Sequence, residues 1–186
     1  MATVPGFGSH GLKPVVVGVS RSEASKAGVA WAAEEAVLRH LPLRLVHALE
    51  WPPGAEPHPH AAHPQRTWSA HFRAGDEMVV REAANPIRER HPHLEVDAPT
   101  ADGPRARVLV QQGAEAALLV VGAKPNVVEQ LFVVSPLGVT LTAHAGCPVA
   151  VVGPPQQASD DQQQLIVVGV DGSANSRVHD GERRSE

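Results

Sequence analysis

Five short apolar runs, separated by helix-forming stretches, constrain the fold of this chain most strongly. Their residues are mainly valine, leucine and alanine, as in strands that are buried on both faces of a sheet. The runs are Val15–Val19, Leu43–Leu49, Leu94–Ala98, Ala117–Val121 and Pro148–Val152. Because strands that alternate with helices form parallel sheets, the pattern predicts an α/β fold. We expect a doubly wound, five-stranded parallel sheet with helices on both faces.

Helices are expected between these runs. The first extends from Ala24 to about His40 and begins either in a capping box from Ser20 to Glu23 or at Ser22. Its three- and four-residue spacing gives a mostly apolar stripe of Ala27, Ala30, Trp31, Glu34 and Leu38. The other helices are predicted at 67–90, 104–112 and 136–145, and Pro86 is expected to bend or shorten the first of these.

The beginning of the chain is repeated near its end. Residues 14–22 read PVVVGVSRS and residues 165–173 read LIVVGVDGS. The offset of 151 residues is about the length of one domain. We therefore expect a lead-in at 1–13, a complete domain at 14–153, a linker at 154–164 and the start of a second copy at 165–186.

Composition narrows the class of function. The net charge of −4 argues against a nucleic-acid partner. Cys147 is the single cysteine, which rules out an intramolecular disulfide and suits a reducing compartment. No apolar run approaches the ~20 residues of a membrane span. These features predict a cytoplasmic protein that interacts with neither nucleic acid nor membrane.

The motifs, taken in order, resemble the universal stress protein family. The matching segments are VVVGV with its serine turn, ASKAGVAWAAEEAVLR, PLRLVHAL, ALLVVGA and AHAGCPVAVVG, which together cover most of residues 14–153. The segment VVGVDGSANSR at 167–177 is similar to the opening of a second such domain. The resemblance implies the adenine-nucleotide-binding type of doubly wound sheet, in a tandem arrangement truncated after the second domain begins.

Nucleotide-binding members of this family carry Gly-x-x-Gly, nine further residues and then Gly-Ser. Here Gly122 is kept, whereas Pro125, Ser135 and Pro136 occupy the other three motif positions. The resemblance also implies an aspartate after the first strand, where this chain has Ser20. The nucleotide-contacting positions that it implies are Gly18, Val19, Ser20, Ala48, Val121, Gly122, Lys124, Pro125, Ser135, Pro136 and Leu137.

The two prolines weaken the predicted phosphate cradle, because proline has no backbone N–H. A charge-assisted hydrogen bond is worth roughly 1.5–3 kcal/mol, so two lost donors lower affinity by on the order of a hundredfold or more. Ser135 and Pro136 also suit a helix start, with serine as N-cap and proline at the first helical position. ATP, with Mg²⁺ accompanying it, is kept as a candidate ligand of a degraded site.

Other candidate sites have simpler interpretations. His58, His60 and His63 have metal-chelating spacing, but they lie in a proline-rich loop without a fixed carboxylate or cysteine, so we expect no metal. His47 is interpreted as a hydrogen-bonded histidine that supports its neighbours, and Cys147 as a small buried hydrophobe. No catalytic set of residues can be placed, so an enzymatic activity is left open and is not the favoured interpretation.

Four functions remain open at this level. The leading one is a regulatory binding module of the stress response with a degraded ATP motif. The alternatives are a weak ATP- or AMP-responsive switch, an ATP-cleaving enzyme and a non-functional tandem remnant. For partners, we expect a homodimer through the edge strand Pro148–Val152, or pairing of that edge with Leu165–Val170 of the same chain.

Overall fold

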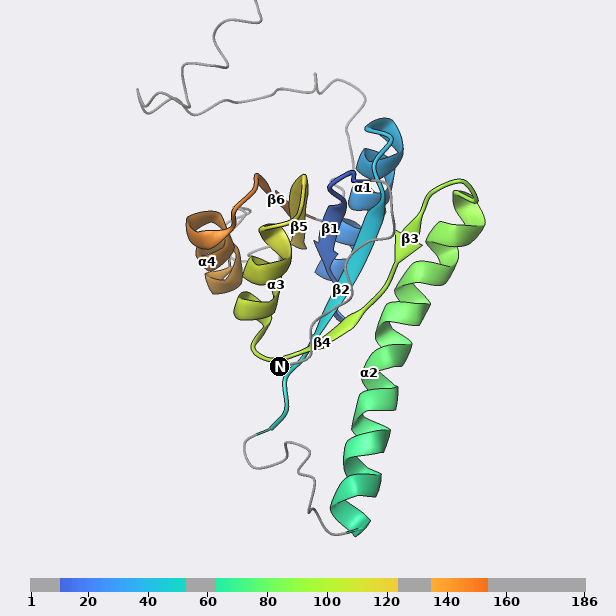
Figure 1. Ribbon diagram of the computed structural model, residues 1–186, viewed down its shortest axis with the longest axis vertical. Helices are drawn as coiled ribbons and strands as arrows, with labels where there is room; N and C mark the ends of the chain where they lie inside the picture. The colour runs from blue at the N-terminus through green and yellow to red at the C-terminus, as the bar shows by residue number, and fades with distance from the viewer. Residues whose placement is uncertain (1–10, 53–62, 124–134, 154–186) are drawn as a thin grey trace, which may run out of the picture. The chain divides into compact units, whose positions relative to one another are not determined.

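The computed structural model describes residues 11–52, 63–123 and 135–153, without the side chains of residues 63–68. These residues all lie within one compact unit, Met1–Pro155. The elements, shown in Figure 1, are β1 (Val15–Gly18), α1 (Glu23–Leu38), β2 (Leu43–Leu49), α2 (His63–Arg90), β3 (Val96–Asp97), β4 (Thr100–Asp102), α3 (Arg105–Gly113), β5 (Leu118–Gly122), α4 (Pro136–His144) and β6 (Val149–Val152).

All the pairings in the sheet are parallel, and its order is β3-β2-β1-β5-β6, with β4 also paired to β2. The predicted doubly wound parallel α/β fold is therefore confirmed. The strand order reverses at β1, which has β2 on one side and β5 on the other. In sheets of this kind the crevice outside the carboxyl ends of the two diverging strands is the usual ligand site.

The third predicted strand, Leu94–Ala98, is shortened to β3 (Val96–Asp97), and β4 (Thr100–Asp102), which was not predicted, follows it. β3 and β4 both pair with β2, one after the other along its length. Pro99 lies between them and has no N–H for the ladder, although its carbonyl still accepts a hydrogen bond from the His47 amide at 3.2 Å. The two short strands fill one position beside β2, so the sheet keeps five positions.

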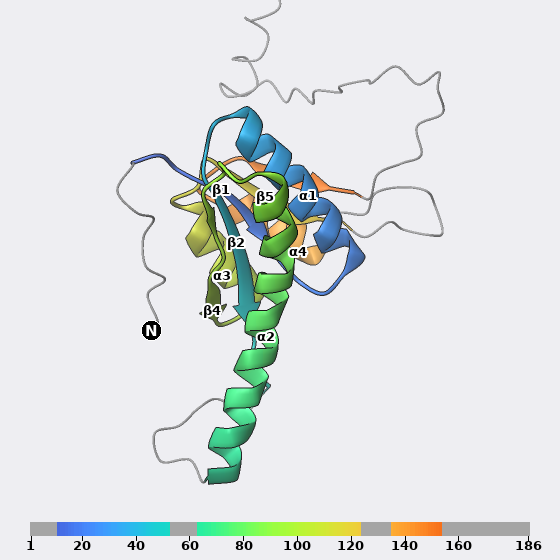
Figure 2. The ribbon, with the colours of Figure 1, turned by 90° about the vertical axis from the view of Figure 1, so that its right-hand side faces the viewer.

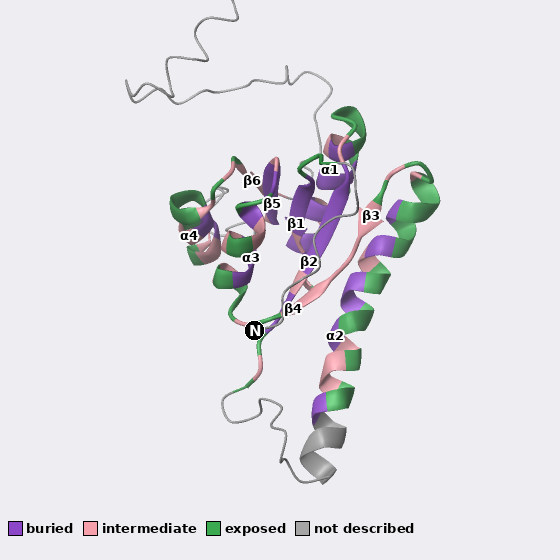
Figure 3. Cartoon of the chain, viewed as in Figure 1, coloured by how far each residue is buried: buried purple, intermediate pink, exposed green. Residues whose placement is uncertain are grey.

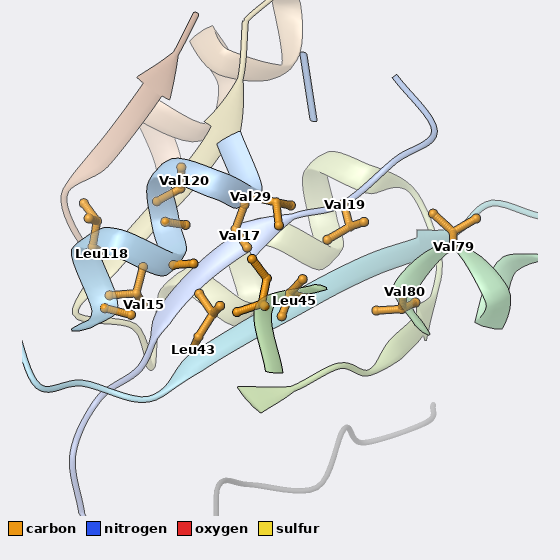
Figure 4. Close-up of a cluster of buried hydrophobic side chains, with 14 residues drawn as sticks. Val15, Val17, Val19, Val29, Leu43, Leu45, Val79, Val80, Leu118 and Val120 are labelled. Carbon is orange, nitrogen blue, oxygen red and sulfur yellow. The ribbon is translucent and has the colours of Figure 1, made fainter. Parts of the chain in front are cut away.

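Two hydrophobic cores lie on opposite faces of the sheet. α1 and α2 cover one face, and α3 and α4 cover the other (Figures 1 and 2). The first core, drawn in Figure 4, joins strand residues such as Val17 and Leu45 to Val29 of α1 and Val79 of α2. The second core contains Val16, Val46, Val108, Leu109, Leu119 and Leu141. Successive valines of β1 thus point into different cores, as the two-residue period of a strand requires.

The stripe predicted for α1 is on the wrong face. Trp31 and Leu38 are exposed, at 39% and 74%. The buried residues are mostly small: Ala24, Ser25, Gly28, Val29, Ala32, Ala33 and Ala36. Alanine is compatible with either face, so the three- and four-residue spacing could not identify the buried one. Ser22 is the N-cap, and its hydroxyl accepts from the Ser25 amide at 3.2 Å, which confirms the alternative start at Ser22.

α2 extends further than predicted at its start and passes through Pro86 to Arg90. The expected early end at Pro86 is wrong. Proline leaves the carbonyl of Glu82 without a helical N–H partner, but both residues are exposed, so water can take that place. Figure 3 shows buried positions of α2 towards the sheet and exposed positions away from it. Within the described residues, no helix is both long and apolar enough to cross a membrane.

Candidate functional site

A small crevice with about 80 Å³ accessible to water lies at the carboxyl ends of β1 and β5. Its floor is apolar and includes Val46 and Leu109, and one wall carries three serine hydroxyls. The residues predicted for the nucleotide site that line it are Gly18, Val19, Ser20, Ala48, Val121, Gly122 and Leu137. The fold therefore brings together seven residues that are distant in sequence, at the place where the strand order reverses.

The remaining predicted residues do not line the crevice in the described part of the chain. Ser135 and Pro136 begin α4 beside Leu137 but are not among the lining residues. Lys124 and Pro125 lie outside the described residues. The role of all these positions in nucleotide binding stays a prediction.

Gly122 has a structural function that its place in the motif did not suggest. A Cβ atom built on it would lie 1.9 Å from the carbonyl oxygen of Ala24 and 2.8 Å from the Ser25 amide nitrogen. These are backbone atoms of α1, which cannot move aside as a side chain can. Glycine is therefore required here for the close approach of α1 to β5.

Ser135 is confirmed as the N-cap of α4. Its hydroxyl accepts a hydrogen bond from the Gly138 amide at 3.2 Å, and its carbonyl accepts one from Val139 at 3.0 Å. Pro136 has no N–H to offer. In the described structure, the Leu137 amide is therefore the one donor left in the first turn of α4. This is much less than the cluster of amides that holds a polyphosphate.

The serine wall of the crevice is already hydrogen-bonded within itself. The Ser20 amide donates to Ser25 Oγ at 2.8 Å, and the hydroxyls of Ser20 and Ser22 lie 3.0 Å apart. The resemblance implies a carboxylate at the Ser20 position. Here the wall is uncharged, so it does not repel an anion in the crevice.

His47 supports the crevice from behind. Its Nδ1 lies 2.8 Å from the carbonyl oxygen of Val19, so Nδ1 carries the hydrogen and donates. Its Nε2 lies 3.5 Å from Asp76 of α2, and Asp76 also lies 3.6 Å from Arg21. This agrees with the interpretation of His47 as a hydrogen-bonded supporting residue.

Arg105 was missed in the sequence and lines the crevice from the first turn of α3. Its Nε donates to Glu50 Oε2 at 2.8 Å, and its amide donates to Glu50 Oε1 at 2.9 Å. Glu50 thereby replaces the side-chain cap that Pro104 cannot supply. The only signal in the sequence was position, because Glu50 directly follows β2 and Arg105 begins the helix after β4.

Among the described residues, the cysteine and the histidines form no further site. Cys147 is half-buried, so its interpretation as a buried hydrophobe is wrong in degree. Its partial burial raises the pKa of the thiol, which favours the uncharged, unreactive form at neutral pH. Of the predicted histidines, His58 and His60 lie outside the described residues, as does the side chain of His63. In the parts of the chain that the structure describes, no group of three or more His, Cys, Asp or Glu side chains could hold a metal ion.

Comparison with known proteins gives the family. The model of the universal stress protein family matches residues 11–153. This chain belongs to the universal stress protein family. A universal stress protein of Mycolicibacterium smegmatis is 30% identical over 169 residues, covering 88% of this chain and 56% of the relative. One from Mycobacterium tuberculosis is 31% identical over 175 residues, with the same coverage. The chain thus spans a little over half the length of these relatives.

Solved universal stress proteins share the fold. A member from Burkholderia pseudomallei has a TM-score of 0.56 at 18% identity, covering 77% of this chain and 98% of that one. A universal stress protein solved in complex with cAMP has a TM-score of 0.55 at 19% identity, with the same coverage. At these identities the likeness establishes the fold of this family member and leaves its ligand to be argued from its own residues.

Proposed function

We propose that this universal stress protein is a regulatory binding module of the stress response whose crevice takes a small adenine nucleotide. The observation that carries the proposal is the crevice at the β1/β5 divergence, which is lined by seven of the residues that the family motif implies. A structural neighbour solved with cAMP supports a ligand of this class. A cytoplasmic location fits this proposal and stays a prediction.

The proposed ligand is a nucleotide with few phosphates, such as AMP, and ATP is bound no better. Gly122 is in contact with the backbone of α1, the Ser135 hydroxyl caps α4, and Pro136 has no amide. These three motif positions therefore add little to the binding of a β- or γ-phosphate. The apolar floor and the Ala48 position remain available to the nucleoside.

Calorimetric titration of the full chain with AMP, cAMP and ATP, each with and without Mg²⁺, tests this proposal. We expect weak binding of AMP, and an affinity for ATP that is no higher than that for AMP, because the described first turn of α4 offers only the Leu137 amide to an outer phosphate. Mg²⁺ should not raise the affinity for any of the three nucleotides. Binding of ATP at least tenfold tighter than AMP would contradict the degraded cradle. A cooperatively melting protein that binds none of the three would favour a module that acts only through protein partners.

No observation in the described crevice favours the enzymatic alternative. Its described lining contains no carboxylate and no histidine, the side chains that would hold a catalytic metal or act as a general base.

The domain organisation also stays a proposal: a complete domain at 14–153, a linker at 154–164 and the start of a second copy at 165–186. Leu165–Val170 lies outside the described residues.

We also propose that the chain forms a homodimer through the outer edge of β6. This strand pairs with β5 on one side only in the described sheet, and its four residues are half-buried and apolar. The carbonyls of Pro148 and Val152 accept hydrogen bonds from β5, so the alternate residues Val149 and Val151 present their backbone groups outwards. An exposed apolar edge of this kind is a template for pairing with another strand.

Substitution of Val151 by proline tests the edge. Proline removes an outward N–H and leaves the ladder to β5 intact, so we expect a dimeric wild type and a largely monomeric V151P protein in sedimentation-velocity experiments. V151A is the matched control, because it loses the side chain and keeps the N–H. If V151P and V151A have the same association state as the wild type, pairing through this edge is wrong. A monomeric wild type would favour the alternative pairing with Leu165–Val170.

A further inference from the structure

Arg105 is the one charged side chain among the described residues that line the crevice. Glu50 accepts hydrogen bonds from its Nε at 2.8 Å and from its backbone amide at 2.9 Å, so the side chain, which is 64% exposed, is anchored at one point, Nε. Its terminal nitrogens, Nη1 and Nη2, have no partner among the described residues. Within the described part of the chain, Glu50 therefore orients the guanidinium and leaves its outer N–H groups available to a ligand.

A guanidinium with free terminal nitrogens matches the oxygens of a phosphate or carboxylate, which can accept two parallel hydrogen bonds. The opposite wall does not compete for it, because Ser20, Ser22 and Ser25 carry hydroxyls and no charge. Glu50 balances the charge of Arg105 in part, but it is not among the residues that line the crevice. Among the described lining residues, the charged side chain that a ligand meets is therefore that of Arg105.

We propose that Arg105 is the phosphate-recognition residue of this crevice, selecting a ligand with a single phosphate group. The phosphate is then held from α3, on the side of the crevice away from the α1 contact with Gly122. Glu50 is a positioning residue that acts through Arg105. This inference rests on the proposed function in placing the phosphate of an adenine nucleotide in the same crevice.

The test compares AMP, adenosine and inorganic phosphate on the full-length protein, by calorimetry and by thermal shift. For the wild type we expect AMP to bind more tightly than adenosine. R105Q should lower the affinity for AMP by about ten- to hundredfold, the factor that a hydrogen bond to a charged group is worth, and leave the affinity for adenosine unchanged. R107Q is the matched control, because Arg107 is exposed on the same helix and does not line the crevice. It should change neither affinity.

Glu50 is tested through its dependence on Arg105. E50Q should reduce the ratio of AMP to adenosine affinity in the wild-type background and leave this ratio unchanged in the R105Q background, because Glu50 acts only by orienting the guanidinium. If E50Q has the same effect in both backgrounds, Glu50 acts only as a helix cap and does not position Arg105. Circular dichroism melts of each variant separate a loss of binding from a loss of folding.

The outcomes separate this inference from the proposed function. If R105Q binds AMP as tightly as the wild type does, the role of Arg105 is wrong, whereas nucleotide binding stands. If neither AMP nor adenosine binds, but inorganic phosphate stabilises the wild type and not R105Q, the proposed function fails and Arg105 remains an anion site for other phosphate monoesters. If none of these ligands depends on Arg105, the inference is overturned.

Discussion

Replacement of Gly122 by alanine is expected to destabilise the protein by about 3 kcal/mol, the upper end of what overpacking costs. The added Cβ would lie 1.9 Å from the carbonyl oxygen of Ala24 and 2.3 Å from its carbonyl carbon, so the whole of α1 must move away from β5. For a domain of this size, the melting temperature should fall by roughly 6–12 °C. Thermal and urea denaturation, followed by circular dichroism, measure both quantities.

Gly75 provides a control for this prediction. It lies inside α2, where the nearest atom to an added Cβ is the end of the Arg21 side chain at 3.8 Å. G75A should therefore stabilise the protein by about 0.5–1 kcal/mol, because alanine is the better helix former. If G122A has the same melting temperature as the wild type but a lower affinity for nucleotide, Gly122 is needed for the ligand and not for the packing of α1.

Removal of the Asp97 carboxylate is expected to cost about 2–3 kcal/mol. Arg44 is buried, with 4% of its side chain exposed, and its Nε donates to Asp97 Oδ2 at 3.1 Å. Its Nη1 donates to Gln112 at 3.2 Å. Breaking a buried pair usually costs about 3–5 kcal/mol, because the other charge is left uncompensated. We expect less here, since 43% of the Asp97 side chain is exposed and Arg44 keeps other partners.

Two further variants check this second prediction. R44M replaces the buried charge by an apolar side chain. Its free energy of unfolding, measured by urea denaturation, should be higher than that of the wild type or lower by no more than about 1 kcal/mol. K26A removes the pair with Glu23, whose two side chains are 68% and 85% exposed, and should cost less than about 0.5 kcal/mol. If D97A is as mild as K26A, the buried pair contributes no more than a surface one.

The fold was largely predictable because β1, β2, β5 and β6 are compact, mostly apolar runs next to helices. Val15–Gly18 and Leu43–Leu49 need no tertiary information to be recognised as buried strands. The buried face of α1 could not be identified, because its alanines are compatible with either face. The residues on both sides of Pro99 form two short strands because both segments pair with β2, which a local pattern does not reveal.

The candidate site was predictable only in its location and its family motif. Gly122 reads as a phosphate-loop glycine in the sequence, and its contact with α1 exists only once the helix packs. Ser135 was correctly interpreted as a helix cap because capping is a local property. Arg105 could not be found from the sequence. It lies on α3, which carries none of the predicted site residues, and its partner Glu50 is 55 residues earlier in the chain.

The contact of α1 with β5 also limits how the crevice can change. Along this side, backbone meets backbone at Gly122, and no flexible side chain can swing away to make room. The opposite side is formed by side chains of α3 and α4, such as Arg105, Leu109 and Leu137. At Gly122 the crevice is therefore fixed by main-chain geometry, whereas its serine wall and the side formed by α3 and α4 consist of replaceable side chains. A change of ligand in evolution or engineering should accordingly arise from substitutions of these side chains, with the backbone contact between α1 and Gly122 held constant.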